Sequence, residues 1–313
     1  MMLQKIPLTM ILHNYDISPY SEMIRLMLGY SEIAWHSAIS PPYPPRPTVD
    51  PLVGGYRRIP IAQIESDIFC DTRIIAAEIA RLSERPELSI DSCESSAAAF
   101  AIKTNGETFF PIVNTAEPRA LLTMLVTRYW PWQILRLIRD RGGVAKTSNM
   151  PRLKKKEMIG NINAFRQELE SKLQDNNYLF GDSPCVADFA AYHVIWFADL
   201  TRSASFLGNY PLTKQWHERM KSIGHGKSQK ISRQSVFQGA KLSEPRALEQ
   251  HLLQHQDINK TITISPSDYA RDSVTGTLVG ADDSRLIIAR ESDQLGTLHV
   301  HFPVEGYDTR IHQ

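Results

Sequence analysis

Polar residues stand at two places where the sequence pattern predicts that a helix begins. Ser18 is followed by Pro19 and an apolar helical pattern, and Asp71 and Thr72 open a second such pattern. The first N–H groups of a helix have no partner within it, and the helix dipole favours negative charge there. Such a place can hold an anion, for example a carboxylate, and a hydroxyl can add a hydrogen bond. The alternative role at each place is an ordinary N-cap.

The elements that position these residues alternate between strand and helix over the first eighty-odd residues. Apolar runs predict strands over 9–15, 33–39, 59–64 and 67–70. Glu65 and Ser66 separate the last two runs, as in a β-hairpin. Six prolines between residues 41 and 51 predict an extended surface loop, because proline fits neither a helix interior nor a central strand. This alternation is typical of a sheet with helices packed on it.

The remainder of the chain changes pattern twice. Residues 92–224 carry apolar residues at helical spacing, most clearly over 121–138, 158–173 and 186–200. A polar stretch over 226–238 is interpreted as a linker, and 245–256 as one further amphipathic helix. Short β-type segments then follow, and they predict a small antiparallel sheet over 261–264, 274–279, 285–289 and 298–302. We expect three parts with the bounds 1–88, 89–226 and 227–313.

The composition argues against several classes of partner. The chain has 35 Lys and Arg against 34 Asp and Glu, so no strong field gathers nucleic acid or an acidic membrane surface. Its three cysteines form no CxxC pair, which argues against a disulfide framework or a cysteine-rich zinc site. Polar residues 13–16 interrupt the apolar start before a signal-peptide core forms. We therefore expect a cytoplasmic protein without a nucleic-acid or membrane partner.

Three stretches, taken together, resemble the glutathione transferase superfamily. They are Y-D-I-S-P-Y-S over 15–21 leading to I-R-L over 24–26, then R-I-P-I over 58–61 with D-T-R-I over 71–74, and G-D-S-P-C-V-A-D-F over 181–189. The resemblance covers roughly the first 225 residues, and the final part of the chain lies outside it. It implies an α/β thioredoxin-like N-terminal domain followed by an all-α C-terminal domain, with the small β-rich segment as an extension.

The resemblance implies a glutathione site around two of these stretches. The Ile59–Pro60 bond would be cis and would turn the Ile59 backbone outward, where it can pair with the cysteinyl unit of glutathione. Asp71 and Thr72 would hold the γ-glutamyl carboxylate at the start of a helix. Family members usually carry Glu or Gln followed by Ser here, so the Asp-Thr pair departs from the pattern. We expect these four residues to bind the peptide.

Two arginines before the Ile-Pro step are candidates for a carboxylate of the ligand. Arg57 or Arg58 can pair with the glycyl carboxylate of glutathione, since a guanidinium suits bidentate recognition. A solvated surface arginine is an equal alternative for either one. Cys70 lies among apolar residues on a predicted strand, and we interpret it as a small core residue.

The resemblance to serine-type members places Ser18 where the activating residue stands. Its hydroxyl would donate to the glutathione sulfur, stabilise the thiolate and so lower the thiol pKa. Tyr15 is the rival, because another branch of the family uses a tyrosine at the end of the first strand. Tyr20 and Ser21 lie in the first helical turn and can also face the ligand.

The function that the resemblance implies is conjugation of glutathione to a small hydrophobic electrophile. Glutathione is then a co-substrate, no cofactor or metal is expected, and a homodimer is expected because family members commonly form one. The alternative is a non-catalytic scaffold that uses the same fold to bind a ligand or another protein.

Two further groups leave alternatives open. The aromatic run over 129–132, Y-W-P-W, either lines the electrophile pocket or packs between helices, and packing is the commoner fate. His299 and His301 alternate on one face of a predicted strand, a spacing that can present two imidazoles to a metal, but no third ligand is evident.

Overall fold

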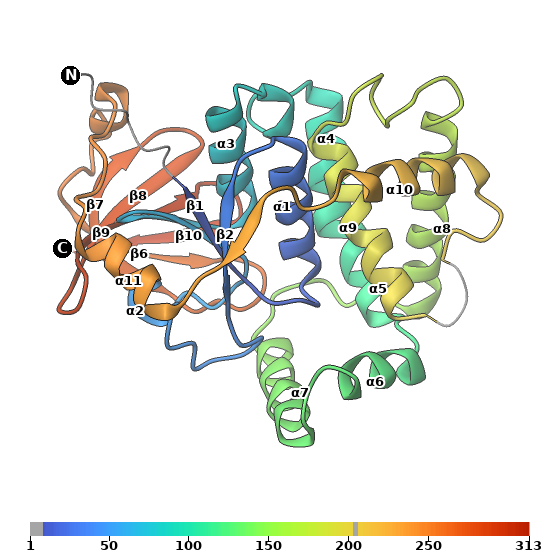
Figure 1. Cartoon of the computed structure of the whole chain (residues 1–313), viewed down its shortest axis with the longest axis horizontal. Coiled ribbons are helices and arrows are strands. Elements are labelled where there is room, and N and C mark those ends of the chain that lie inside the picture. Colours follow the sequence, from blue (N-terminus) through green and yellow to red (C-terminus); the bar gives the residue numbers. More distant parts are fainter. Residues whose placement is uncertain (1–8, 203–205, 313) are drawn as a thin grey trace.

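The structure is a computed structural model that describes residues 9–202 and 206–312. Figure 1 shows the β-rich end of the molecule on one side, the helical end on the other, and α1 and α3 between them. The helices are α1 (Pro19–Tyr30), α2 (Asp50–Val53), α3 (Thr72–Ser83), α4 (Ser95–Lys103), α5 (Phe109–Asn114), α6 (Pro118–Val126), α7 (Pro131–Lys146), α8 (Lys155–Lys172), α9 (Val186–Leu200), α10 (Pro211–Ile223) and α11 (Arg233–Lys241). The strands are β1 (Met10–Asn14), β2 (Trp35–Ile39), β3 (Ile61–Ile64), β4 (Asp67–Cys70), β5 (Ser228–Lys230), β6 (Thr261–Pro266), β7 (Val274–Ala281), β8 (Arg285–Ser292), β9 (Gly296–Pro303) and β10 (Tyr307–Ile311).

The first four strands form the thioredoxin-like sheet that the sequence predicts. Their order is β4-β3-β1-β2, with β1 parallel to β2 and antiparallel to β3. Side chains alternate between the two faces, since successive residues of a strand point opposite ways. Met10 and Leu12 belong to the core shared with α1 and α3, whereas Ile11 belongs to the core on the other face. The predicted hairpin is confirmed, with Glu65 at a positive φ of 55° in its turn.

Both predicted helix starts are confirmed as N-caps. The Ser18 side chain accepts a hydrogen bond from the Ser21 N–H at 3.2 Å, and Pro19 occupies the first turn of α1. Asp71 caps α3 in the same way by accepting from the Arg73 N–H at 3.0 Å. These caps fix the direction in which the two helices leave the sheet.

The middle of the chain is helical, as predicted, and is organised around the buried helix α9. The Asp188 carboxylate fixes the start of this helix, because it accepts from the Cys185 N–H at 3.0 Å, the Leu179 N–H at 2.9 Å and the Trp216 indole N–H at 2.8 Å. One helix expected over 121–138 is wrong. Residues between α6 and α7 break it, because Pro131 cannot donate the hydrogen bond that a continuous helix needs.

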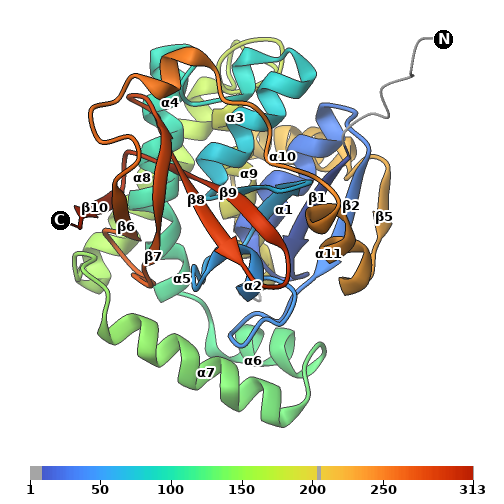
Figure 2. The ribbon, with the colours of Figure 1, turned by 90° about the vertical axis from the view of Figure 1, so that its left-hand side faces the viewer.

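The C-terminal strands continue the thioredoxin-like sheet. Strands β6 to β10 pair antiparallel among themselves, as predicted, and β10 is a strand that the sequence pattern did not reveal. Strand β9 then pairs parallel with β4, with Asp67 opposite His299 and Phe69 opposite His301. The result is one ten-stranded sheet in the order β10-β6-β7-β8-β9-β4-β3-β1-β2-β5. Figure 2 shows β8 and β9 with α2 and α11 lying against this region.

Two interpretations of the segment after residue 226 are wrong. The expected linker over 226–238 contains β5, which pairs parallel with β2, and the start of α11. Strand β5 is three exposed residues long, so it has no apolar alternation to read. The expected helix over 245–256 is only a short 3₁₀ turn over Gln250–Leu253. Strand β5 and strand β9 thus cover the two edges of the thioredoxin-like sheet.

Buried charges join the extension to the first domain. Arg246 pairs with Glu78 of α3 at 2.7 Å, and its backbone N–H donates to Asp67 at 3.0 Å. The other Asp67 oxygen lies 2.8 Å from His301 Nε2. Burial lowers the pKa of His301 to about 4, so the imidazole is neutral near pH 7 and acts as a hydrogen-bond partner. His301 is therefore a structural residue of the β4–β9 junction.

Glu78 makes this junction sensitive to acid. Burial alone would raise its pKa, but hydrogen bonds and charge from Arg81 and Arg246 outweigh burial and lower the pKa from 4.5 to about 2. A carboxyl whose pKa is lowered by folding stabilises the protein above its unfolded pKa and loses that contribution as pH falls toward the folded pKa. Such a shift corresponds to roughly 3 kcal/mol.

We therefore expect Glu78→Gln to lower the free energy of unfolding by about 3 kcal/mol near pH 7, with the difference from wild type vanishing toward about pH 2. Urea unfolding across this pH range measures it. Glu244→Gln, which removes an exposed acid near Arg246, is the matched control and should change little. An equal, pH-independent loss in both variants would contradict the role assigned to Glu78.

Candidate functional site

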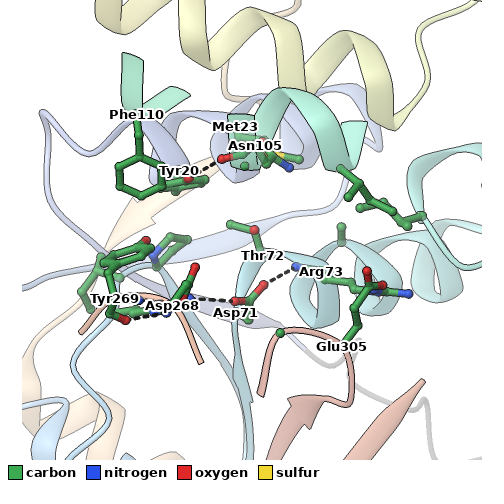
Figure 3. Close-up of a pocket in the computed structure, with 18 of the residues that line it drawn as sticks. Tyr20, Met23, Asp71, Thr72, Arg73, Asn105, Phe110, Asp268, Tyr269 and Glu305 are labelled. Atoms are coloured by element: carbon green, nitrogen blue, oxygen red, sulfur yellow. Dashed lines mark hydrogen bonds and ion pairs between the residues drawn. The ribbon is translucent and has the colours of Figure 1, made fainter. Parts of the chain in front are cut away.

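A cavity of about 240 Å³ lies where the thioredoxin-like domain, the helical domain and the C-terminal extension meet. Figure 3 shows Tyr20, Asn105 and Phe110 on one side of it and Asp71, Asp268 and Tyr269 on the other. The lining residues are Tyr20, Met23, Tyr56, Arg58, Ile59, Pro60, Asp71, Thr72, Arg73, Ala76, Ile90, Ile102, Asn105, Gly106, Phe110, Met150, Val186, Asp268, Tyr269, Glu305 and Gly306. All five residues predicted to bind glutathione, namely Arg58, Ile59, Pro60, Asp71 and Thr72, are therefore on one wall.

Free backbone and hydroxyl groups distinguish the wall formed by β3 and α3. The Ile59–Pro60 bond is cis, as the resemblance implies. Within residues 9–202 and 206–312, the N–H and C=O of Ile59 have no hydrogen-bond partner. The Thr72 N–H and hydroxyl, at the first position of α3, are likewise without a partner in the described part of the chain. These groups remain available to an extended peptide and to an anion.

The Asp71 carboxylate is already engaged by the protein. One oxygen accepts from the Arg73 N–H at 3.0 Å, and the other accepts from the Tyr307 hydroxyl at 3.0 Å. The Tyr56 hydroxyl lies 2.7 Å from that of Tyr307 and completes the chain of hydrogen bonds. Tyr307 comes from β10, so the extension reaches the N-terminus of α3.

Arg58 is the charged centre of the cavity and is also engaged by the extension. Its Nη2 pairs with the Asp268 carboxylate and donates to the Tyr269 carbonyl at 2.5 Å, while Nη1 lies 3.8 Å from Asp71. The Tyr269 ring lies against the guanidinium, with its centroid 4.1 Å from Cζ. Arg57, the other predicted arginine, points elsewhere and pairs with Asp140 of α7. Arg58 is thus the one of the two arginines that lines this cavity.

The helical domain supplies a more apolar wall with one polar element. A π-helix, Thr104–Thr108, connects α4 to α5 and brings Asn105 to the cavity. Such turns are frequent at functional sites. The Tyr20 hydroxyl donates to the Asn105 carbonyl at 3.2 Å, and Asn105 Oδ1 is buried without a partner among the described residues. Burial raises the pKa of Tyr20 well above its usual value, so this hydroxyl keeps its proton near neutral pH.

Ser18, Tyr15 and Ser21 do not line the cavity. The Ser18 side chain is 1% exposed and acts as the cap of α1, although its own proton has no acceptor among the described residues. The Tyr15 hydroxyl accepts from Arg141 of α7 at 3.3 Å, and the Ser21 hydroxyl is buried with no partner in the described part of the chain. Of the four residues considered near the glutathione sulfur, namely Tyr15, Ser18, Tyr20 and Ser21, Tyr20 is the one that lines the cavity.

The packing interpretation of the aromatic run over 129–132 is confirmed for Tyr129, which is half-buried against Met124 of α6 and Leu137 of α7 in one core cluster, but neither interpretation is correct for the two tryptophans. Trp130 and Trp132 are 66% and 58% exposed, and their rings stack on each other at 5.3 Å between centroids. They lie at the start of α7, outside both the cavity and the core. In the described ranges, no group of three or more potential ligands is arranged to hold a metal ion.

Taken together, the cavity can hold a small peptide that carries carboxylates. It offers an unpaired backbone segment at Ile59, free donors at the N-terminus of α3, and a guanidinium at Arg58. Met23, Ile102 and Met150 give it an apolar side beside Tyr20. The residues from the extension were not predictable as site residues, because Asp268 and Tyr269 stand in an ordinary turn sequence between two strands.

Family models identify both of the main domains. The glutathione S-transferase N-terminal domain matches residues 12–87, and the glutathione S-transferase C-terminal domain matches residues 144–225. The chain therefore belongs to the glutathione S-transferase superfamily. The thioredoxin-like and helical domains of the structure agree with both matches.

A solved structure extends the likeness to the C-terminal strands. A GST-like protein from Pseudomonas syringae is 26% identical and superposes with a TM-score of 0.78, covering 97% of this chain and 100% of that one. Coverage this complete includes the extension, so that protein has a counterpart of it. A glutathione S-transferase from Rhodospirillum rubrum F11 is 14% identical, covers 68% of this chain and 88% of its own, and has a TM-score of 0.49. No curated protein matches the chain. Over the described residues, no helix has the length and apolarity needed to cross a membrane.

The cysteines provide a test of how the site is packed. Cys70, as predicted, is a fully buried core residue next to Asp71, and burial raises its pKa well above the usual range. Burial also raises the pKa of Cys185 to about 12, whereas Cys93 is only partly covered. A thiolate is the reactive form, so buried thiols with raised pKa react slowly.

We expect a thiol reagent to modify Cys93 first in the native protein, and Cys70 and Cys185 only after unfolding. Reaction with an aromatic disulfide, followed by absorbance with and without denaturant, gives the number of thiols. Cys93→Ser should show no fast phase. Rapid native labelling of Cys70 would mean that β4 and the start of α3 are open to solvent, contrary to the structure.

Proposed function

We propose that the cavity binds glutathione and that the chain transfers its thiolate to a small hydrophobic electrophile. The observation that carries this proposal is that one cavity is lined by two sets of polar groups with no hydrogen-bond partner among the described residues, the Ile59 N–H and C=O and the Thr72 N–H and hydroxyl. The first suits the extended cysteinyl unit, and the second suits the γ-glutamyl carboxylate. Pro60 and Asp71 hold these two segments in place, and Arg58 would receive the glycyl carboxylate.

The thiolate needs a hydrogen-bond donor that keeps its proton. We propose Tyr20 for this role, because it lies in the cavity wall and its raised pKa keeps its hydroxyl protonated, and the hydroxyl would redirect to the sulfur the hydrogen bond that it donates to the Asn105 carbonyl. Ser18 is the second candidate, supported by the family resemblance and by its free proton, although its hydroxyl is buried as the cap of α1. The apolar side of the cavity would receive the electrophile.

The location and the assembly of the chain are proposed on separate grounds. Three free cysteines fit a reducing, cytoplasmic location. A homodimer is proposed from membership of the superfamily alone. The near balance of charges gives no reason to add nucleic acid or a membrane as a partner.

A glutathione-binding scaffold without catalysis is the second candidate function. The buried position of Ser18, which caps α1, favours it. A repurposed member of the superfamily could keep the peptide site while it loses turnover.

We expect wild type to bind glutathione in calorimetry and to conjugate it to an aromatic halide. Thr72→Val, which removes one hydroxyl at nearly constant volume, should weaken binding about tenfold, as loss of a hydrogen bond to a charged group does. Tyr20→Phe should keep most of the binding but lower kcat about 100-fold, the usual cost of losing one donor to a developing anion.

Ser18→Gly separates the two donor candidates, because glycine at an N-cap costs only a few tenths of a kcal/mol. If Ser18→Gly abolishes turnover with an unchanged melting temperature while Tyr20→Phe stays active, Ser18 is the donor and our assignment is wrong. Binding without turnover in wild type selects the scaffold. Absence of binding by wild type overturns the proposed function as a whole.

A further inference from the structure

The loop between β6 and β7 places a carboxylate directly on the arginine of the cavity. The Asp268 carboxylate pairs with Arg58 Nη2. The carbonyl of the next residue, Tyr269, accepts a hydrogen bond from the same nitrogen, and the Tyr269 ring stacks on the guanidinium. Tyr269 also packs edge-on against Phe110 of α5 at 5.1 Å between centroids. The loop thus forms a wall of the cavity that the two family domains alone would not supply (Figure 3).

The loop is held in this position from two sides. The Asn149 N–H donates to the Asp268 carbonyl at 2.7 Å, and the Asn149 amide donates to the Ser267 carbonyl at 3.1 Å. On the other side, the Ser267 N–H donates to the Gly306 carbonyl at 3.0 Å. These bonds engage the main chain of the loop and would stay in place if the Asp268 carboxylate turned away, which would give up only its bond to Arg58 and the hydrogen bond that its Oδ1 accepts from the Tyr269 N–H at 2.8 Å. The Asp268 side chain is 43% exposed, which gives the carboxylate access to water when it turns.

The donors of Arg58 are unequally used. Nη2 is occupied by Asp268 and the Tyr269 carbonyl, whereas Nε is buried and has no partner among the described residues. A carboxylate binds a guanidinium best through two parallel bonds, and one edge of the fork consists of Nε and Nη2. A ligand that takes this edge would satisfy Nε, but it must displace Asp268 from Nη2.

We propose that Asp268 is a built-in competitor for the ligand carboxylate at Arg58, and hence a residue that determines specificity. The inference rests on the proposed function, because it concerns the site assigned to glutathione. Exchange of one carboxylate for another on Arg58 gives little net electrostatic gain. The site therefore selects ligands whose other contacts, at Ile59 and Thr72, supply enough binding free energy to displace the Asp268 side chain into solvent.

The volume of the cavity agrees with the proposed displacement of Asp268. Its volume of about 240 Å³ is below the range of roughly 300–1,000 Å³ that is common for small-molecule sites. Displacement of the Asp268 side chain would enlarge the cavity next to Arg58. A ligand without a carboxylate would leave Asp268 paired with Arg58, and only the smaller cavity would then be available to it.

The test compares Asp268→Asn with wild type in calorimetry, using glutathione and glutathione amidated at its glycyl carboxylate. Asp268→Asn keeps the shape of the side chain and removes the competing charge. We expect it to bind glutathione about five- to tenfold more tightly than wild type, the lower end of the usual coupling between two ligands. The amidated peptide should gain nothing. Asp272→Asn is the matched control, because it removes the same charge from the same loop but pairs with Arg57 at 3.6 Å.

The outcomes separate this inference from the function on which it rests. Tighter binding of glutathione by Asp268→Asn than by wild type, with no gain for the amidated peptide, supports the inference. The inference is overturned, and the function stands, if wild type binds glutathione and Asp268→Asn binds it equally or more weakly. The same holds if the affinity for the amidated peptide rises as much as that for glutathione, or if Asp272→Asn gains as much affinity as Asp268→Asn. No binding by any variant overturns the function. If Asp268→Asn melts well below wild type, Asp268→Ser replaces it in the same comparison.

Discussion

The parallel pairing of β4 with β9 is the constraint on which the rest of the structure depends. Without it, β4 would end the thioredoxin-like sheet with a row of unpaired backbone groups, and an exposed strand edge invites association. The pairing is specified by more than backbone hydrogen bonds, because Asp67 on β4 meets His301 on β9 and Arg246 from the preceding segment. Buried polar groups must find partners, so this cluster fixes one register.

That register determines where the extension touches the candidate site. With β9 held against β4, the loop after β6 and the start of β10 come to the N-terminus of α3 and to Arg58. The chain of contacts from Tyr56 through Tyr307 to Asp71 then ties the core of the extension to the cap of the helix. The two family domains would form this site between them, and the extension adds a third wall to it.

The sequence predicts the parts of this arrangement that depend on local chemistry. Ser18 and Asp71 are caps because serine and aspartate suit that position, and the hairpin and strands β6 to β9 follow from their runs of apolar residues, whereas β10 does not. Strand β5 escapes prediction because it is short and exposed, and it exists only through its pairing with β2. The contact of Asp268 with Arg58 escapes for a related reason. It joins residues far apart in sequence, and only the folded register brings them together.

The candidate site likewise contains some residues that the sequence predicts and others that it does not. The positions around Ile59 and Thr72 are recognisable from the sequence, because a motif marks them and the structure leaves their polar groups free. Asn105 carried no signal, since a π-helix is not visible in a helical pattern. Trp130 and Trp132 were expected to line the electrophile pocket or to pack between helices, yet the break before α7 places both on the surface.

Amide hydrogen exchange of the whole chain, with and without glutathione, tests most directly whether the extension is part of the ligand site. If the extension is part of the site, exchange should slow around Ile59 and Thr72 on binding and should also change in peptides that contain Asp268 and Tyr269. Binding that protects the first two segments and leaves the Asp268 loop unchanged would contradict the three-walled site. The extension would then be a cover for the β4 edge alone.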